Sequence, residues 1–316
     1  MKHIKRWPSM ALFLAASAIA TSAAFGADRP VITAVGYWPP SNEMLRRFSP
    51  NPDQNPEGWI GENWEGRGYD VYAFFPEFDP PDCDFCGKGF GDFEVDYQDT
   101  SNDFWPIIGA LQPIAQLSFG RGASNYSWEV EMNQYNRASW YNDYQAPYQP
   151  TPCPPDESVP PEWLRPSLLP VQEIADAVNE AEIGVYSYVD WNGDCGAFLC
   201  EYLAYHDVWY QDLHSDPTDP AWCITAGHIH VGKFIDWGTA QQAAEITIRT
   251  VADYLDSVLY GPGDVNHDGS VDTADLLALL AAWGDCPAPP EPCPADFNDD
   301  QTVNTSDLLI LLANWG

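Results

Sequence analysis

The C-terminal part of the chain contains an internal duplication. GDVNHDGSVDTADLLALLAAWG begins at Gly263, and ADFNDDQTVNTSDLLILLANWG begins at Ala295, 32 residues later. In both copies, oxygen-bearing residues occupy positions 1, 3, 5, 9 and 12 of a loop, and an apolar stretch follows. Agreement at these ten positions and in the shared DLL and LLA segments argues against two unrelated acidic turns. Residues 263–316 are therefore expected to fold as one paired module.

The spacing in each copy predicts a calcium site. Ca²⁺ takes six to eight oxygen ligands at about 2.3–2.6 Å, and a tight loop folds them around one point, with a backbone carbonyl at position 7. The expected ligands are Asp264, Asn266, Asp268, Ser270, Asp272 and Asp275 in the first loop, and Asp296, Asn298, Asp300, Thr302, Asn304 and Asp307 in the second. Gly269 suits the sharp turn of the first loop, whereas Gln301 stands there in the second. The second loop is therefore expected to be more strained and to bind calcium more weakly.

The apolar stretches after the loops predict two short helices. LLALLAAW ends at Gly284 and LLILLANW ends at Gly316, and helices this short must pack on each other to bury their apolar faces. Residues 263–316 resemble the dockerin family, whose loop–helix repeats dock onto cohesin-type receptors on scaffolds or cell surfaces. The resemblance implies a small all-α attachment domain with two calcium sites and a cohesin-like or cell-surface receptor. The spacer DCPAPPEPCP departs from ordinary dockerins.

The N-terminus has the order of a secretory signal peptide. Lys2, Lys5 and Arg6 precede an apolar run at 10–20, and the small-residue stretch TSAAFGA follows. The run is shorter than the ~20 apolar residues that a membrane-spanning helix needs. We therefore expect residues 1–27 to be a signal peptide and the protein to be secreted or held at the cell surface, without membrane insertion.

The chain is strongly acidic, with 47 Asp and Glu against 13 Lys and Arg and a net charge of −34. Such a field repels phosphate backbones and anionic lipid heads, which argues against nucleic-acid and membrane-surface binding. Eight cysteines suit an oxidising compartment. Their spacing makes Cys286–Cys293 and Cys83–Cys86 plausible disulfides. The CDFC pair could also bind a metal, but no second pair follows at zinc-finger spacing.

Residues 30–259 alternate between strand-like and helix-like segments. Short apolar runs rich in β-branched and aromatic residues predict strands at 31–35, 69–76, 113–119, 183–189 and 222–231. Helices are expected at 171–181, 197–211 and 239–259. This alternation favours an α/β fold in three layers, with a mainly parallel sheet covered by helices. The Pro-rich stretch 134–169 is expected to form a long surface loop near the site.

Two cysteines follow a predicted strand in the segment DCGAFLCEYLAYH. Cys195 is expected at the start of a helix and Cys200 about one turn inside it. The positive end of a helix lowers the pKa of a nearby thiol and favours the thiolate. The alternative interpretation is that both cysteines are buried or bonded in disulfides.

Two further segments place ionisable side chains on strand faces. His228 and His230 alternate with an isoleucine in AGHIHVG, so both face one side and could act as a proton shuttle. They could instead be structural or hold a metal, although no third ligand is evident. Glu129 and Glu131 share one face of the strand in SWEVEM, where a carboxylate could orient an imidazole. A solvated acidic edge is the alternative.

In the order Glu, Cys, His, these segments resemble the pyroglutamyl-peptidase I family of cysteine peptidases. That family carries a GFGPF-type turn after its first strand, a GR…E…N segment, a D-A-G-x-Y-L-C box and an F-[IV]-H-V-P box. Here VITAVGYWPPSN matches the GFGPF-type turn only partly, and FGRG with Glu131 and Asn136 matches the GR…E…N segment. DCGAFLC matches the D-A-G-x-Y-L-C box, and HIHVG matches the F-[IV]-H-V-P box. The match spans roughly 31–257 and implies Cys200 as nucleophile, His230 as base and Glu131 as the carboxylate that orients it.

The resemblance implies an acyl transfer that removes an N-terminal pyroglutamyl residue from a peptide substrate without a cofactor. Cys200 would attack the carbonyl, His230 would protonate the leaving amine, and backbone N–H groups near Cys200 would hold the oxyanion. Tyr37 and Trp38 are expected to sandwich the small ring. Two alternatives stay open: an inactive relative that acts as a binding module with Cys200 in a disulfide, and an unrelated surface or adhesion component.

Overall fold

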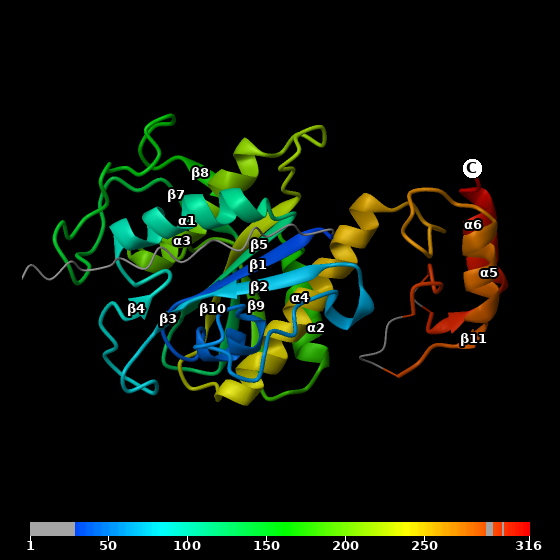
Figure 1. Cartoon of the computed structure of the whole chain (residues 1–316), viewed down its shortest axis with the longest axis horizontal. Helices are drawn as coiled ribbons and strands as arrows, with labels where there is room; N and C mark the ends of the chain where they lie inside the picture. Colours follow the sequence, from blue (N-terminus) through cyan, green and yellow to red (C-terminus); the bar gives the residue numbers. More distant parts are fainter. Residues whose placement is uncertain (1–28, 289–292, 299) are drawn as a thin grey trace, which may run out of the picture.

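A six-stranded sheet lies at the centre of the larger part of the chain (Figure 1). The computed structural model describes residues 29–288, 293–298 and 300–316, so the expected signal peptide at 1–27 lies outside the described residues. The strand order is β2-β1-β5-β10-β6-β9. The strands are β1 (Val31–Gly36), β2 (Asp70–Phe74), β5 (Ala115–Arg121), β6 (Ser127–Glu131), β9 (Tyr186–Asp190) and β10 (Thr225–Val231).

The sheet is mainly parallel, as the alternation of segments predicts. β1 runs parallel to β2 and β5, and β5 runs parallel to β10. β6 pairs antiparallel with β10, and β9 pairs parallel with β6, so the last two strands run against the other four. Every residue of β1 and β2 is buried, which explains why their sequences are largely apolar and do not alternate between apolar and polar residues.

Helices cover both faces of the sheet, which confirms the three-layer prediction (Figure 1). Alternate residues of β1 divide between two cores: Ile32 packs in the core that contains α2 and α4, and Val31 and Val35 pack in the core that contains α1 and α3. The helices are α1 (Tyr97–Leu111), α2 (Val171–Glu180), α3 (Leu199–Leu213) and α4 (Trp237–Leu259). Within the described ranges, no helix combines the length and apolarity that crossing a membrane requires.

Two parts of this architecture differ from the sequence-based expectation. α1 is not predicted from its sequence because Pro106 and Gly109 interrupt it, but Asp96 caps its first turn by accepting hydrogen bonds from two backbone N–H groups. The Pro-rich stretch expected to be one loop contains a short antiparallel pair. Its strands are β7 (Asn133–Tyr135) and β8 (Leu164–Pro166).

The start of α3 also differs from the prediction. The helix begins at Leu199, so Cys200 lies in its first turn and not one turn inside it. Cys195 therefore lies in the segment before the helix and not at its start. The correction places the Cys200 sulfur closer to the free N–H groups of the helix end.

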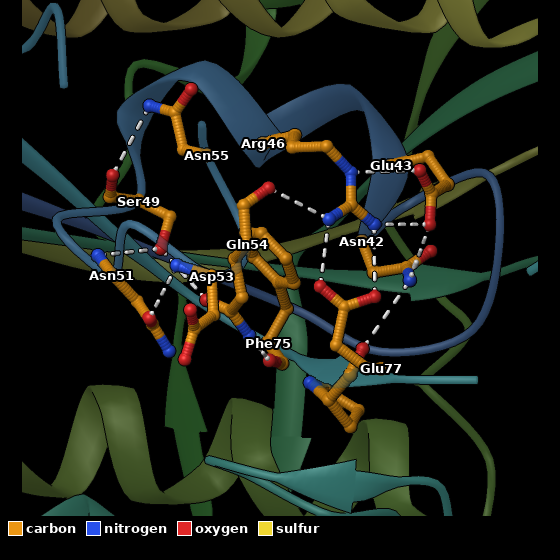
Figure 2. Close-up of polar contacts among 11 residues, drawn as sticks. Asn42, Glu43, Arg46, Ser49, Asn51, Asp53, Gln54, Asn55, Phe75 and Glu77 are labelled. Carbon is orange, nitrogen blue, oxygen red and sulfur yellow. Dashed lines mark hydrogen bonds and ion pairs between the residues drawn. The ribbon is translucent and has the colours of Figure 1, made fainter. Parts of the chain in front are cut away.

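An ion-pair network holds the turn that follows β1 (Figure 2). The Arg46 guanidinium contacts Glu43 at 2.6 Å within the same short helix and Glu77 at 2.7 Å beyond β2. It therefore ties together two segments that leave neighbouring strands at the same edge of the sheet. The short elements in these segments are η1 (Glu43–Phe48), η2 (Trp64–Gly66), β3 (Pro76–Glu77) and β4 (Phe90–Gly91).

The C-terminal module packs its two helices on each other (Figure 1). Its core includes Val271, Leu279, Val303 and Leu311, two residues from each repeat. Both helices begin three residues earlier than expected, because a capping box starts each of them. The elements are α5 (Thr273–Ala281), α6 (Thr305–Ala313) and the short pair β11 (Gly284–Asp285) with β12 (Thr302–Val303).

Candidate active site

The structure brings three of the predicted site residues together at the carboxyl ends of the parallel strands. His230 is the second-last residue of β10, and Cys200 lies in the first turn of α3. Glu131 ends β6, the antiparallel neighbour of β10. Open α/β sheets bind their ligands outside the carboxyl ends of their strands.

A chain of hydrogen bonds joins the three side chains. His230 Nδ1 lies 2.6 Å from Glu131 Oε1, and the Glu131 side chain is 1% exposed. The His230 ring is also hydrogen bonded to Cys200. Burial alone would lower the pKa of His230, but the hydrogen bonds to Cys200 and Glu131 outweigh it and raise this pKa to about 10. The imidazole is therefore held in its protonated form at neutral pH.

Cys200 is a free thiol in this structure. The disulfides among the described residues join Cys83 to Cys86 and Cys286 to Cys293, the two pairs that the spacing made plausible. Cys195 is free and buried, and burial raises the pKa of its thiol well above the usual range. No disulfide joins Cys195 to Cys200.

Gly120 on β5 makes room for the sulfur. A Cβ atom at this position would lie 2.5 Å from Cys200 Sγ and 2.8 Å from His228 Nε2. Both distances are below van der Waals contact, so no larger residue fits unless the thiol or the imidazole moves. This close approach gives a physical reason for the glycine in the FGRG segment.

The two candidate carboxylates, Glu129 and Glu131, have different hydrogen-bond partners. Glu131 meets the ring nitrogen of His230, whereas Glu129 is hydrogen bonded to Tyr188 on the edge strand β9. Asn136, which follows at the family's spacing, is buried outside the triad. Its side chain exchanges two hydrogen bonds with the backbone of Asp156 and so holds the Pro-rich stretch.

The structure separates the two residues expected to sandwich a small ring. Tyr37 is 1% exposed and packs in the core between the sheet and α3, with its hydroxyl 2.6 Å from Thr100. Its ring therefore offers no free face, which corrects the expectation of a stacked pair. Trp38 is partly exposed, and the Arg121 guanidinium lies 4.7 Å from the centre of its ring.

An aromatic cluster around Trp38 was missed in the sequence. Phe198 and Tyr144 each lie 6.0 Å from Trp38 between ring centres. Phe198 is the N-cap of α3, two positions before Cys200, and Tyr144 comes from the Pro-rich stretch. The position of Phe198 two residues before Cys200 was a usable signal. No such signal exists for Tyr144, because its contact with Trp38 joins segments more than a hundred residues apart.

Glu201 is a second residue that sequence reasoning missed. It follows Cys200 directly, is fully buried, and accepts a hydrogen bond from the backbone N–H of Tyr135. Burial raises its pKa to about 8. A carboxyl group that is largely protonated at neutral pH places little negative charge beside the Cys200 sulfur.

His228 lies beside the triad on the same strand. Its ring centre is 4.9 Å from that of His230, and its Nδ1 lies 2.7 Å from Ser118 Oγ. Burial holds the pKa of His228 well below the usual range, so the ring is neutral. The sequence showed no third ligand for a metal at the two histidines, but the structure places Cys200 next to both.

The C-terminal loops have the donors and the backbone shape that calcium needs. In the first loop, the Asp264 carboxylate accepts hydrogen bonds from the N–H groups of Asp268 and Gly269, and the buried Asp275 accepts from Val265 and Asp272. Asp296 and Asp307 make the corresponding contacts in the second loop. These bonds fold carboxylate, amide and carbonyl oxygens into a tight turn, and such oxygens are the donors that Ca²⁺ prefers.

The backbone at the sharp turn is left-handed in both loops. The φ angle is +86° at Gly269 and +66° at Gln301. Glycine adopts this region without cost, whereas a residue with a side chain is strained there. The strain expected at Gln301 is therefore present.

Comparisons with known proteins agree with this two-part organisation. The model of the dockerin type I domain matches residues 262–314. Domains of this type bind calcium and pair with cohesin. No curated protein sequence matches the chain.

The larger part has the fold of pyroglutamyl peptidase I. A mutant pyrrolidone carboxyl peptidase from Pyrococcus furiosus superposes with a TM-score of 0.50 at 13% identity over 71% of this chain and 99% of that one. The pyrrolidone carboxyl peptidase of Thermococcus litoralis gives 0.50 at 15% identity over 72% and 96%. The pyroglutamyl peptidase I of Bacillus amyloliquefaciens gives 0.50 at 14% identity over 71% and 95%.

Proposed function

We propose that this chain is an exported cysteine peptidase of pyroglutamyl-peptidase type, attached to a receptor through its dockerin domain. The observation that carries the catalytic part is the hydrogen-bonded chain from Glu131 through His230 to Cys200, in a fold shared with pyroglutamyl peptidase I. The likeness in fold alone does not imply an activity, so the proposal depends on the chemistry of these three side chains.

The reaction begins with the Cys200 thiolate attacking the carbonyl carbon that joins the pyroglutamyl residue to the next residue. The negative charge then moves to the carbonyl oxygen. Phe198 makes no side-chain capping bond, so the first N–H groups of α3 are available to stabilise that oxyanion. The protonated His230 gives its proton to the leaving amine as the C–N bond breaks, and a thioester to Cys200 remains.

Hydrolysis of the thioester completes the cycle. His230, now neutral, takes a proton from a water molecule that attacks the thioester carbonyl, and the thiolate leaves with free pyroglutamate released. Glu131 keeps the ring oriented and stabilises the imidazolium in both steps. The partly exposed Trp38 would contact the flat lactam ring, with Phe198 and Tyr144 beside it.

A fluorogenic pyroglutamyl amide tests the catalytic part. Under reducing conditions the protein should cleave it, and Cys200→Ala should abolish turnover. The matched control is Cys153→Ser, which changes another free cysteine that is exposed and belongs to no part of the site. Turnover that survives in Cys200→Ala, or none on any N-blocked amide, would overturn the proposal.

The attachment part rests on the duplicated module. The apolar side chains exposed on each helix, together with the tryptophan that follows it, are repeated in both copies and form a surface available to a receptor. They are Leu277, Leu280 and Trp283 in the first copy and Leu309, Leu312 and Trp315 in the second. In this proposal, residues 1–27 direct export, 30–259 catalyse and 263–316 bind two Ca²⁺ ions and a cohesin-like receptor. Calcium-dependent capture of the full chain by immobilised cohesin modules tests it, and capture unaffected by chelation would contradict it.

A further inference from the structure

We propose that Cys200, His228 and His230 together bind a transition-metal ion, with Zn²⁺ as the ion that fits the donors best, and that zinc bound there reversibly blocks the thiol. The binding itself is inferred from geometry alone. Its inhibitory effect rests on the proposed peptidase function.

The three side chains converge on one point. Cys200 Sγ and a ring nitrogen of each histidine all lie within 4.8 Å of one another. Ligand atoms around a tetrahedral zinc ion lie about 3.5 Å apart, so side-chain movements of roughly an ångström complete the site. One thiolate and two imidazoles are a donor set that Zn²⁺ prefers over Ca²⁺ or Mg²⁺, and three protein ligands leave a fourth position for water.

His228 has a feature that the proposed catalysis does not use. Its Nε2 atom is buried and has no hydrogen-bond partner among the described residues. Leaving such a group unpaired costs about 1–3 kcal/mol. His228 Nε2 faces Cys200. A Cβ atom placed on Gly120 would lie 2.8 Å from this nitrogen and 2.5 Å from Cys200 Sγ, so the nitrogen and the sulfur lie around the same point. A metal ion coordinated by His228 Nε2 would give this buried nitrogen a partner.

Both imidazoles are already oriented for coordination through Nε2. Glu131 holds Nδ1 of His230, and Ser118 holds Nδ1 of His228 at 2.7 Å. Ser118 is in turn hydrogen bonded to the buried Asp207. Histidine ligands of metals commonly donate their second N–H to a carboxylate or another acceptor, which fixes the tautomer and strengthens the ligand.

Metal binding involves no redox step. Cys200 coordinates as the thiolate, and any proton on its sulfur or on Nε2 of either ring is released to solvent. The bound ion then holds the sulfur and the His230 nitrogen that the acyl transfer needs. The F-[IV]-H-V-P box of the resembling family has phenylalanine where this chain has His228, so that box does not supply this third ligand.

Cobalt absorption tests the site directly. The full-length protein, reduced with a phosphine and saturated with Ca²⁺ so that the loops are filled, is titrated with Co²⁺ and then with Zn²⁺. We expect a thiolate-to-cobalt charge-transfer band that Zn²⁺ displaces, and that Cys200→Ser abolishes. His228→Phe should weaken Zn²⁺ binding by at least about tenfold, the loss that an outer-shell change alone produces. Cys153→Ser should leave the band unchanged.

The outcomes separate this inference from the proposed activity. His228→Gln provides a second variant at the buried position, and circular dichroism confirms that each variant is folded. A band that depends on Cys200 and His228 supports the metal site even in a protein that cleaves no pyroglutamyl amide. Inhibition of an active enzyme by Zn²⁺, relieved in His228→Phe, supports the blocking role. A wild-type protein without the band, or a band that both His228 variants retain at full Zn²⁺ affinity, would overturn the proposal.

Discussion

Around Cys200, several residues determine how the neighbouring side chains lie. Glu131 orients His230, Ser118 orients His228, and Gly120 leaves space for the sulfur. Ordered motifs in the sequence were enough to predict Cys200, His230 and Glu131 as a group. The contact of Ser118 with His228 could not be predicted, because it joins neighbouring strands across 110 residues of sequence.

Replacing the orienting carboxylate should change both the rate and its pH dependence. In Glu131→Gln, kcat/KM should fall by roughly 10²-fold or more, because the imidazolium loses its charged partner. Glu131 helps raise the pKa of His230 to about 10, and the protonated ring is lost as pH rises through that value. In Glu131→Gln, the alkaline limb of the plot of kcat/KM against pH should therefore shift to lower pH.

The matched control is Glu129→Gln. Glu129 is the other carboxylate on the same strand face, but its hydrogen-bond partner is Tyr188. Profiles of kcat/KM against pH for the three proteins provide the measurement. An alkaline limb at the same pH in Glu131→Gln and the wild type would show that Glu131 does not act on His230 in this way.

Adding one methyl group at Gly120 should displace the thiol. The new Cβ in Gly120→Ala would lie 2.5 Å from Cys200 Sγ, and a misplacement of about an ångström in a reacting atom costs up to 10²-fold in rate. We expect a lower kcat/KM and an altered rate of Cys200 alkylation by iodoacetamide. Gly109→Ala in α1 is the control, because its Cβ meets no atom within 4 Å. Unchanged kinetics in Gly120→Ala would contradict the close packing.

At the level of the elements, periodic segments were predictable and interrupted ones were not. α4 and α2 follow the predicted ranges closely because their apolar residues repeat with the period of a helix. α1 was missed because Pro106 and Gly109 argue against a helix, while tertiary packing of Phe104 and Ile108 stabilises it. The antiparallel insertion of β6 beside β10 depends on tertiary contacts that no local pattern reveals.

The two calcium loops differ at one residue in a way that can be tested. Gln301→Gly should relieve the left-handed strain at φ +66° and tighten the second site by about 1 kcal/mol, or about fivefold in Kd. Gly269→Ala is the reverse change in the first loop, where the added Cβ meets no neighbouring atom and only the backbone conformation is affected. Calorimetry of Ca²⁺ binding to the full chain measures both. An unchanged or weaker second site in Gln301→Gly would refute the strain argument.

For the whole molecule, the two parts are stabilised by different means. The larger part buries two extensive apolar cores against its sheet, whereas the core of the C-terminal module contains five buried apolar residues among those that the structure describes. Residues 263–316 also carry about ten acidic side chains without a lysine or arginine to offset them. Calcium is therefore expected to supply much of the folding free energy of the module.

Chelation should unfold the module alone. After Ca²⁺ is removed, amide protons in α5 and α6 should exchange rapidly, because the loop carboxylates repel one another and the small core cannot hold them. The strands β1, β5 and β10 should stay protected in the same sample and serve as the internal control. Hydrogen exchange followed by mass spectrometry measures both regions. Full protection of α5 and α6 in chelator would contradict calcium-dependent folding.

Capturing the acyl-enzyme tests the central claim most directly. The reduced protein is mixed with a pyroglutamyl amide, quenched in acid during turnover, digested and analysed by mass spectrometry. The proposed mechanism predicts a pyroglutamyl thioester on the peptide that contains Cys200, and no adduct in Cys200→Ala. Cleavage of the amide with no adduct on Cys200, or with the adduct on a different residue, would contradict it.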